Sequence, residues 1–301
     1  MRRILITGSN GLLGQKLVHL LRGRTDVELL ATSSGHNRIS DQDGYSYRSL
    51  DVTSPIQVHE TLLEFNPTVV IHTAALTLVD LCETEKEKCH ALNVDAVQYI
   101  LDACQEVDAH LIHVSTDFVF NGEEGPYREE DTPDPLSEYA RSKYEAERLI
   151  QQSGYKKWSI ARTIIVYGYC ENMSRSNIVL WARETLKNGG PMTIVDDQFR
   201  APTLAEDLAM GCWLIAEKGA LGIYHLSGPE TMSVIDMVRR IARYYDFSEE
   251  HISPTDSDSL GQAAKRPPRT GFILDKSRRV LGYTPHTLEE GLALIDVQLP
   301  L

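Results

Sequence analysis

The first half of the chain alternates short apolar runs with longer amphipathic segments. The apolar runs are rich in β-branched residues, which is typical of strands buried on both faces of a parallel sheet. They occupy residues 2–7, 27–32, 68–74, 109–116 and 157–163. Helical patterns lie between them, at residues 11–23, 85–107 and 138–154. The alternation predicts a doubly wound α/β fold, a Rossmann-like parallel sheet with helices on both faces.

The regular alternation weakens after about residue 168. A helical pattern at residues 176–190 leads into residues 192–203, and a strand-like run follows near 222–227. We expect the strand near 222–227 to rejoin the sheet. The chain is therefore predicted to form a dinucleotide-binding domain at residues 1–168 and a smaller substrate-binding lobe at 169–301.

Two segments of this smaller lobe have a sequence pattern typical of a helix N-terminus. Thr203 with Glu206, and Thr287 with Glu290, have the spacing of a capping box. In that motif the threonine hydroxyl and the glutamate carboxylate each satisfy a backbone N–H of the first helical turn. We expect helices to open at both threonines.

The composition narrows the classes of partner. The 301 residues carry a formal net charge of −13, with 42% hydrophobic and 24% charged residues. Nucleic acids and anionic membranes require a basic face, so we expect neither as a partner. The longest apolar runs are also far too short to span a bilayer. An acidic chain can still bind a phosphorylated small molecule through a local group of arginines.

The cysteines and histidines bear on compartment and metal binding. The five cysteines form no CxxC pair, and their odd count favours buried thiols in a reducing compartment. The N-terminal residues enter a strand-like run at once, without a signal-peptide pattern. We therefore expect a cytoplasmic protein. The ten histidines show no ligand spacing, and no catalytic metal is predicted.

Three glycines mark a candidate phosphate-binding loop. Gly8, Gly11 and Gly14 follow the first predicted strand directly and open the first predicted helix. Glycines at such a turn let the backbone approach a pyrophosphate, whose charge the helix N-terminus stabilises. Their spacing is GxxGxxG and not the GxGxxG of the common fingerprint. A turn that serves packing alone is the alternative, but the strand–loop–helix context favours a dinucleotide.

The end of the second predicted strand bears on which dinucleotide binds. NAD-binding proteins commonly place an acidic residue there to hold the ribose hydroxyls. This chain has no acid at that point and offers Ser33, Ser34 and Arg38 to a 2′-phosphate. The sequence therefore favours NADPH, with NADH as the alternative. A further strand is expected just before Asp51, whose carboxylate would contact adenine or cap the following turn.

A tyrosine and a lysine form a candidate proton-transfer pair. Tyr139 and Lys143 are four residues apart in a predicted helix, so their side chains share one face. A nearby ammonium lowers the pKa of a tyrosine by roughly one to three units. A surface helix with an aromatic residue and a lysine would look the same. Thr116 ends a predicted strand at the carboxyl edge of the sheet, where ligands bind in such folds.

Several motifs in order resemble one family, the extended short-chain dehydrogenases/reductases, and within it the dTDP-4-dehydrorhamnose reductases. The resemblance covers nearly the whole chain. It rests on TGSNGLLG, HTAALTLVD, VSTDFVFNG, YARSK, ARTIIVYG, DQFRAPT and the late RPPR and LGYTP. Several motifs in the right order are far more specific than any one of them.

The resemblance implies an NAD(P)H-dependent oxidoreductase that reduces the 4-keto group of a nucleotide-activated deoxysugar. It assigns catalysis to Thr116, Tyr139 and Lys143. Tyr139 would protonate the keto oxygen and Thr116 would hydrogen-bond it. Lys143 would lower the pKa of Tyr139 and hold the nicotinamide ribose. A nucleotide sugar is thus the implied partner, in deoxysugar or cell-envelope synthesis, and homodimerisation stays open.

The motifs and the resemblance together define the candidate contacts. Cofactor contacts are expected at Gly8, Asn10, Gly11, Leu12, Gly14, Ser33, Arg38, Asp51, Val52, Ala74, Ala75, Tyr139 and Lys143. Substrate contacts are expected at Thr77, Phe118, Asn177, Gln198, Arg200 and Arg266. Arg266 and Arg269 are candidate phosphate partners because arginine binds phosphate bidentately, with a solvated basic loop as the alternative.

Three positions depart from the pattern of these reductases. Phe118 and Ile165 stand where a tyrosine and a tryptophan usually contact the sugar, and Arg200 stands where glycine is usual. The identity of the sugar is therefore open, whereas the catalytic residues are intact.

Two other classes of function compete, and the first is another nucleotide-sugar enzyme of the same superfamily, a dehydratase or an epimerase. A nucleotide-sugar dehydratase typically carries an Asp–Glu pair after the threonine, but here Phe118 follows Asp117. An epimerase usually keeps the acidic residue that the second strand lacks. The other class is a non-catalytic NADP-binding regulatory subunit that resembles the methionine adenosyltransferase β-subunit.

Overall fold

A parallel seven-stranded sheet forms the centre of the computed structural model, which describes residues 1–299. Its strands are β1 (Arg2–Thr7), β2 (Val27–Ser33), β3 (Ser46–Ser49), β4 (Val69–His72), β5 (His110–Thr116), β6 (Trp158–Thr163) and β11 (Gly222–His225). Their order is β11-β6-β5-β4-β1-β2-β3, and every neighbouring pair is parallel. Chain order reverses at β1, and ligands bind in such sheets beyond the carboxyl ends of the strands at this point.

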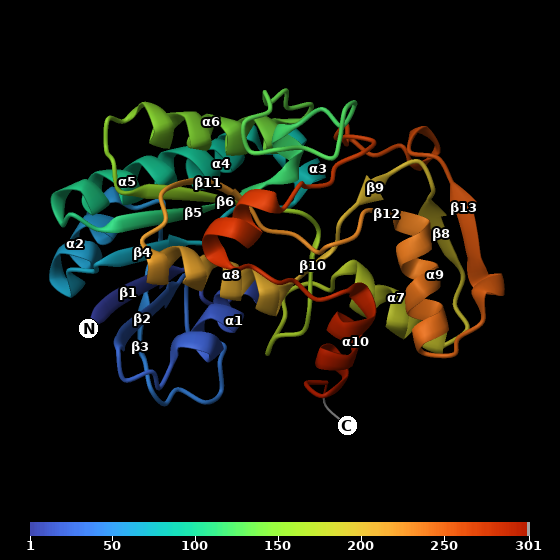
Figure 1. Ribbon diagram of the computed structural model, residues 1–301, viewed down its shortest axis with the longest axis horizontal. Coiled ribbons are helices and arrows are strands. Elements are labelled where there is room, and N and C mark those ends of the chain that lie inside the picture. The colour runs from blue at the N-terminus through green and yellow to red at the C-terminus, as the bar shows by residue number, and fades with distance from the viewer. Residues whose placement is uncertain (300–301) are drawn as a thin grey trace.

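Helices cover both faces of the sheet (Figure 1). One layer contains α2 (Pro55–Phe65), α5 (Ala96–Glu106) and α6 (Glu138–Gln152), and the other α1 (Leu12–Leu21) and α8 (Ala205–Lys218). Successive side chains of a strand point to opposite faces. Accordingly Leu5 packs in the cluster of the first layer, whereas Ile4 and Ile6 pack in that of the second. The predicted doubly wound, Rossmann-like fold is confirmed.

The remaining elements lead from the sheet into a smaller lobe, which Figure 1 shows at the right. The lobe and its short strand pairs comprise β7 (Val166–Tyr167), α7 (Ile178–Lys187), β8 (Met192–Val195), β9 (Phe199–Arg200), β10 (Thr203–Leu204), β12 (Met232–Ser233), α9 (Val234–Tyr244), β13 (Ile252–Thr255) and α10 (Leu288–Asp296). Its hydrophobic cluster contains residues from Tyr167 onward. Short turns of helix complete the chain at Asp117–Val119, Glu249–His251, Asp258–Leu260 and Ser277–Leu281.

The segment predicted as one helix at residues 85–107 is interrupted. It consists of α4 (Lys86–His90), a π-helical turn η1 (Ala91–Asp95) and α5, and a short helix α3 (Val79–Thr84) precedes it. π-helical turns occur often at functional sites. The turn contains a buried asparagine, Asn93, whose side chain bonds to Ser142 of α6.

The two predicted helix starts have different outcomes. Thr287 forms the expected capping box with Glu290 at the start of α10. The capping box predicted at Thr203 is wrong. Thr203 belongs to strand β10, and its hydroxyl donates a hydrogen bond to Ile164 O at 2.6 Å. Helix α8 starts at Ala205 without a side-chain cap. Within residues 1–299, no helix combines the length and the apolar character needed to cross a membrane.

Candidate active site

A cavity of about 670 Å³ opens at the carboxyl edge of the sheet, where the lobe meets it. The glycine loop after β1, the ends of β4, β5 and β6, helix α6 and the segment before α7 contribute its lining. Of the predicted site residues, the cavity brings together Gly8, Asn10, Gly11, Leu12, Gly14, Ala75, Thr77, Thr116, Phe118, Tyr139, Lys143 and Asn177. Residues from both predicted parts of the chain therefore line one site.

The glycine loop forms a tight cradle. Gly8 has φ +70°, and a Cβ there would lie 2.8 Å from Ala74 N. A Cβ on Gly14 would overlap Gly8 O and lie 2.6 Å from Ser9 Cα. Gly11 is the N-cap of α1 and offers no side chain to the first-turn N–H groups. These donors, at a helix N-terminus that lines the cavity, fit the phosphates of a dinucleotide.

Asn10 ties this loop to the segment after β2. Its Nδ2 donates to His36 O at 2.8 Å, and its Oδ1 accepts from Arg38 N at 2.9 Å. Neither Ser33 nor Arg38 lines the cavity. The guanidinium of Arg38 makes no hydrogen bond or salt bridge within residues 1–299 and so stays available beside the loop.

Three further expected cofactor contacts lie apart from the cavity. The carboxylate of Asp51 accepts hydrogen bonds from the backbone and the hydroxyl of Thr53, at 2.9 and 2.7 Å, which is the turn-capping alternative. Val52 is buried in the core. Ala74 donates its backbone N–H to Thr7 Oγ1 at 3.4 Å. None of the three side chains lines the cavity.

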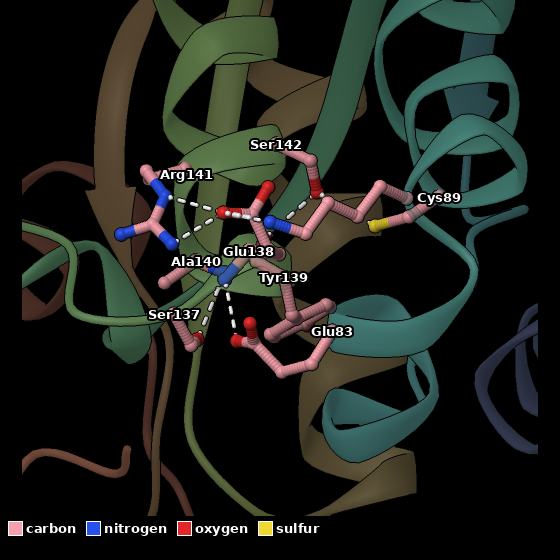
Figure 2. Close-up of polar contacts among 9 residues, drawn as sticks. Glu83, Cys89, Ser137, Glu138, Tyr139, Ala140, Arg141 and Ser142 are labelled. Atoms are coloured by element: carbon pink, nitrogen blue, oxygen red, sulfur yellow. Dashed lines mark hydrogen bonds and ion pairs between the residues drawn. The ribbon is translucent and has the colours of Figure 1, made fainter. Parts of the chain in front are cut away.

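The first turn of α6 is held from two sides (Figure 2). Ser137 is the N-cap, and its hydroxyl accepts from Ala140 N at 3.3 Å. A carboxylate oxygen of Glu83, at the end of α3, accepts from Glu138 N at 2.8 Å. Tyr139 lies in this turn, so both contacts fix the direction in which its ring leaves the helix.

Asn93, in the π-helical turn, braces the same helix. Its amide donates to Ser142 Oγ at 3.0 Å and to Leu76 O at 3.0 Å, and it accepts from Leu76 N at 2.8 Å. Ser142 in turn donates to Tyr139 O at 2.8 Å. Asn93 is not among the residues expected from the sequence, although an asparagine inside an amphipathic helical pattern is a usable signal.

Tyr139 is buried beside the hydroxyl of Thr116. Burial raises the pKa of Tyr139 well above its usual value, while the Thr116 hydroxyl and the positive charge of Arg175 act in the opposite direction. Phe118 packs edge-on against the ring, with centroids 6.1 Å apart. A phenol in this setting keeps its proton, as a general acid must before it reacts.

Lys143 bonds to strand β5. Its ammonium donates to Val114 O at 2.8 Å and lies 3.1 Å from His113 Nε2. Burial lowers the pKa of Lys143 to about 8, against the opposing charge of Glu147. The lowering of the Tyr139 pKa expected from Lys143 is not found, because the ammonium bonds to β5 and burial dominates at the phenol.

Thr116 stands at the end of β5 with its hydroxyl at the cavity. The Thr116 hydroxyl donates to Asp117 Oδ1 at 3.1 Å and accepts from Phe118 N at 3.2 Å. Asp117 is buried and also accepts a hydrogen bond from Thr270. Burial raises the pKa of Asp117, although the charge of Arg200 opposes the shift. The carboxyl group thereby fixes the orientation of the threonine.

Three expected substrate residues line the cavity. Thr77 accepts a hydrogen bond from Arg175 Nη2 at 3.0 Å. Phe118 contributes its ring. Asn177 caps α7, accepting from Leu180 N at 3.3 Å, and donates to Gly168 O at 2.7 Å. Arg175 was missed by the sequence analysis, and it is, with Lys143, one of the two cationic side chains in the lining.

The other three expected substrate residues do not line the cavity. Arg200 is fully buried, and its guanidinium donates to Phe199 O and Pro267 O at 2.7 Å each. Gln198 accepts from Arg200 at 3.2 Å. Arg266 pairs with Asp80 at 2.7 Å. Their donors are already engaged by the protein.

Arg200 still acts on the site indirectly. Its guanidinium lies 5.5 Å from the ring centroid of Phe118, a cation–π arrangement. Phe118 also lines the cavity that contains Tyr139. Arg200 thus supports a ring that shapes the substrate end of the cavity.

Comparison with known proteins covers nearly the whole chain. Residues 1–298 match the family described as RmlD substrate binding domain. A dTDP-4-dehydrorhamnose reductase of Aggregatibacter actinomycetemcomitans is 31% identical over 304 residues, 97% of this chain and 97% of its own. The methionine adenosyltransferase 2 subunit beta of Pongo abelii is 32% identical over 272 residues, 88% of this chain and 78% of its own.

The fold is similar to that of a solved dTDP-4-dehydrorhamnose reductase. A dTDP-4-dehydrorhamnose reductase from Bacillus anthracis str. Ames, in complex with NADP, matches with a TM-score of 0.84 and 27% identity. The match covers 99% of this chain and 100% of that one.

Proposed function

Because this chain belongs to the RmlD substrate binding domain family, of the extended short-chain dehydrogenase/reductase superfamily, we propose that it is an NAD(P)H-dependent reductase. Its substrate is a nucleotide-activated deoxysugar, whose 4-keto group it reduces, as the name of the dTDP-4-dehydrorhamnose reductases describes. The relative that is 31% identical over 97% of both chains supports this proposal.

The observation that carries the proposal is the meeting of Tyr139 and Thr116 in one cavity with the glycine cradle. When bound, the nicotinamide supplies a hydride to the carbonyl carbon. Tyr139 donates its phenolic proton to the carbonyl oxygen. The Thr116 hydroxyl turns its one proton from Asp117 Oδ1 to the same carbonyl oxygen and positions it. The reaction consumes one ketone, one reduced cofactor and one proton, and yields the alcohol and the oxidised cofactor.

Arg175 extends this assignment to the nucleotide. Its guanidinium is at the cavity, exposed, and bonded to the neutral hydroxyl of Thr77 and to no carboxylate within residues 1–299. A guanidinium in that state binds a diphosphate through charge-assisted hydrogen bonds. We assign it to the diphosphate of the nucleotide sugar.

NADPH is the preferred cofactor in this proposal, and NADH an alternative. Asn10 accepts a hydrogen bond from the backbone N–H of Arg38 and so keeps this residue beside the glycine loop. The Arg38 guanidinium itself has no partner within residues 1–299 and can bind a 2′-phosphate there. The solved relative in complex with NADP supports the same choice.

The experiment is the loss of nicotinamide absorbance with NADPH and NADH in parallel, in the presence of a dTDP-4-keto-6-deoxy sugar. Tyr139→Phe is the control, since it removes only the proton donor. Turnover with the wild-type protein that disappears in Tyr139→Phe supports the reductase and ranks the cofactors. Cofactor binding without oxidation in either arm contradicts it.

A regulatory subunit is the second candidate. The 32% identity to a methionine adenosyltransferase 2 subunit beta over 88% of this chain favours it. Under this function the chain would bind NADP, turn over no keto sugar and form a tight complex with another protein. Co-purification with a methionine adenosyltransferase catalytic subunit, together with no turnover, would support this candidate over the reductase.

We also retain the predicted division into residues 1–168 and 169–301. The separate hydrophobic cluster from Tyr167 onward supports it, although α8 and β11 of the second part pack in the sheet layer. The five cysteines are free and buried, which supports a reducing compartment such as the cytoplasm. Homodimerisation stays a prediction.

A further inference from the structure

A histidine of β5 is one of two partners of the Lys143 ammonium. His113 Nε2 lies 3.1 Å from Lys143 Nζ, and Val114 O lies 2.8 Å from it. Both side chains are nearly inaccessible to solvent, with 2% exposure for Lys143 and 1% for His113. Water therefore does not compete for the ammonium on this side, and the two partners decide where it points.

The chemistry of the contact fixes the state of the ring. An ammonium group has only donors, so His113 Nε2 must accept and its proton must sit on Nδ1. Burial and the charge of Lys143 both hold the pKa of His113 well below its usual value. His113 is thus a neutral acceptor that faces a cation.

A second histidine lies behind the first. The rings of His72 and His113 stack with centroids 5.6 Å apart and an interplanar angle of 23°. His72 Nδ1 is 2.7 Å from Thr7 Oγ1, and that hydroxyl also accepts from Thr73 N at 3.2 Å. One stacking contact and the hydrogen bonds on either side of it therefore connect the lysine, through two imidazoles, to the end of β1 where the glycine loop begins.

These two imidazoles are poor core residues. His113 Nδ1 and His72 Nε2 are buried, and neither has a hydrogen-bond partner within residues 1–299. Leaving a buried polar group unpaired is costly, and apolar side chains of similar size would avoid that cost. A stabilising role in the core alone does not explain two such groups beside the lysine.

We propose that His113 is a positioning residue that holds the Lys143 ammonium at the cofactor end of the cavity, with His72 and Thr7 holding the His113 ring. The proposal rests on the proposed function and on the role that the family resemblance gives Lys143, which is to hold the nicotinamide ribose. Lys143 itself lines the cavity, whereas His113 does not, so His113 acts only through the lysine.

The titratable groups around Lys143 come from four elements. Glu147 on α6 and Cys89 on α4 raise its pKa, while burial lowers it to about 8. His113 on β5 and His72 on β4 face it in neutral form. An apolar residue in place of His113 removes an acceptor that favours the ammonium, so the pKa of Lys143 falls further.

The test compares His113→Leu with His113→Gln, whose Oε1 restores an acceptor near the position of Nε2. The measured quantities are the Kd for NADPH, from nicotinamide fluorescence without sugar, and the pH dependence of kcat. His113→Leu should weaken NADPH binding about tenfold and move the alkaline limb of kcat about one unit lower. His113→Gln should recover most of both.

His110→Leu is the matched control. His110 lies on the same strand, is also buried and bonds to Ser159 Oγ at 2.8 Å, with no contact to the lysine. It should lower Tm while leaving the Kd and the alkaline limb unchanged. If His113→Leu does not fold, His113→Asn carries the test, since its acceptor falls short of the ammonium and should give the same two shifts.

The outcomes separate this proposal from the proposed function. If the wild-type protein reduces the sugar but the His113 variants change only Tm, His113 is a structural residue and the positioning proposal is wrong. If the wild type binds NADPH but reduces no sugar, the proposed function fails, and the Kd values for NADPH of the His113 variants decide the positioning proposal. A Kd for His113→Leu equal to that of the wild type would then overturn it. If the wild type binds no NADPH, the proposed function fails and this proposal fails with it.

Discussion

The buried carboxylate of Glu147 receives two hydrogen bonds from the guanidinium of Arg162, at 2.9 and 2.6 Å. Glu147 lies on α6, one turn beyond Lys143, and Arg162 lies on β6. Both side chains are almost entirely inaccessible to solvent. The pair therefore fastens the helix that carries Tyr139 and Lys143 to the central sheet.

Replacing Glu147 by glutamine should destabilise the protein strongly. The amide keeps the shape of the carboxylate but leaves the charge of Arg162 buried without a counterion, which costs about 3 kcal/mol in the free energy of unfolding. Denaturant unfolding measures the change. Glu64→Gln is the control, since Glu64 pairs with Arg48 on the surface, and we expect no measurable effect there. Equal changes in the free energy of unfolding for the two variants would contradict a stabilising role of the buried Glu147–Arg162 pair.

Alanine at Gly14 should impair cofactor binding far more than alanine at Gly11. A Cβ on Gly14 would overlap Gly8 O and force the loop to open, whereas a Cβ on Gly11 would lie 3.3 Å from the same oxygen. We expect the Kd for NADPH to rise at least about tenfold for Gly14→Ala, and about two- to threefold for Gly11→Ala. Titration of nicotinamide fluorescence measures both. An unchanged Kd for NADPH in Gly14→Ala would contradict the assignment of the glycine loop to the cofactor phosphates.

The lowered pKa of Lys143 should make the free energy of unfolding depend on pH. Its pKa is about 8 in the folded protein against 10.5 for the free side chain, so between these values the unfolded chain binds more protons. Stability therefore rises with pH in this window, as the penalty for a buried charge disappears. Relative to Lys143→Met, the wild type should gain up to about 3 kcal/mol from pH 8 to 10.5. Parallel curves for the two proteins would refute the depressed pKa.

Arg175→Ala should weaken substrate binding and spare the chemical step. Loss of a charge-assisted contact to a diphosphate should raise the KM for the nucleotide sugar about tenfold or more, with kcat changed by less than about threefold. Arg279→Ala is the matched control, because Arg279 is exposed and does not line the cavity. Steady-state kinetics give both constants. A fall in kcat with an unchanged KM would argue against a diphosphate contact.

Local patterns were sufficient for most of the sheet and for the helix that carries Tyr139 and Lys143. The apolar run that forms β5 and the amphipathic pattern of α6 each specify their own structure, because burial on a known face leaves few alternatives. The spacing of Gly8, Gly11 and Gly14 similarly fixes a loop whose geometry depends on the backbone alone. These features needed no knowledge of distant contacts.

The misassigned residues depend on tertiary contacts that the sequence does not show. Arg200 points into the protein because carbonyl groups of the Pro267 segment accept its donors there. Arg175 reaches the cavity only because the segment before α7 folds back over Thr77. The direction of the Lys143 ammonium depends on His113, which its own helix cannot specify.

Transfer of deuterium from NADPH labelled at C4 of the nicotinamide tests the central claim most directly. Each of the two C4-deuterated forms is incubated with the protein and a dTDP-4-keto-6-deoxy sugar, and the product is examined by mass spectrometry and NMR. The account predicts one deuterium on the former keto carbon from one of the two forms, at a rate about 10²–10⁴-fold lower in Tyr139→Phe. A sugar that gains no deuterium from either form, or equal rates in Tyr139→Phe and the wild type, would contradict it.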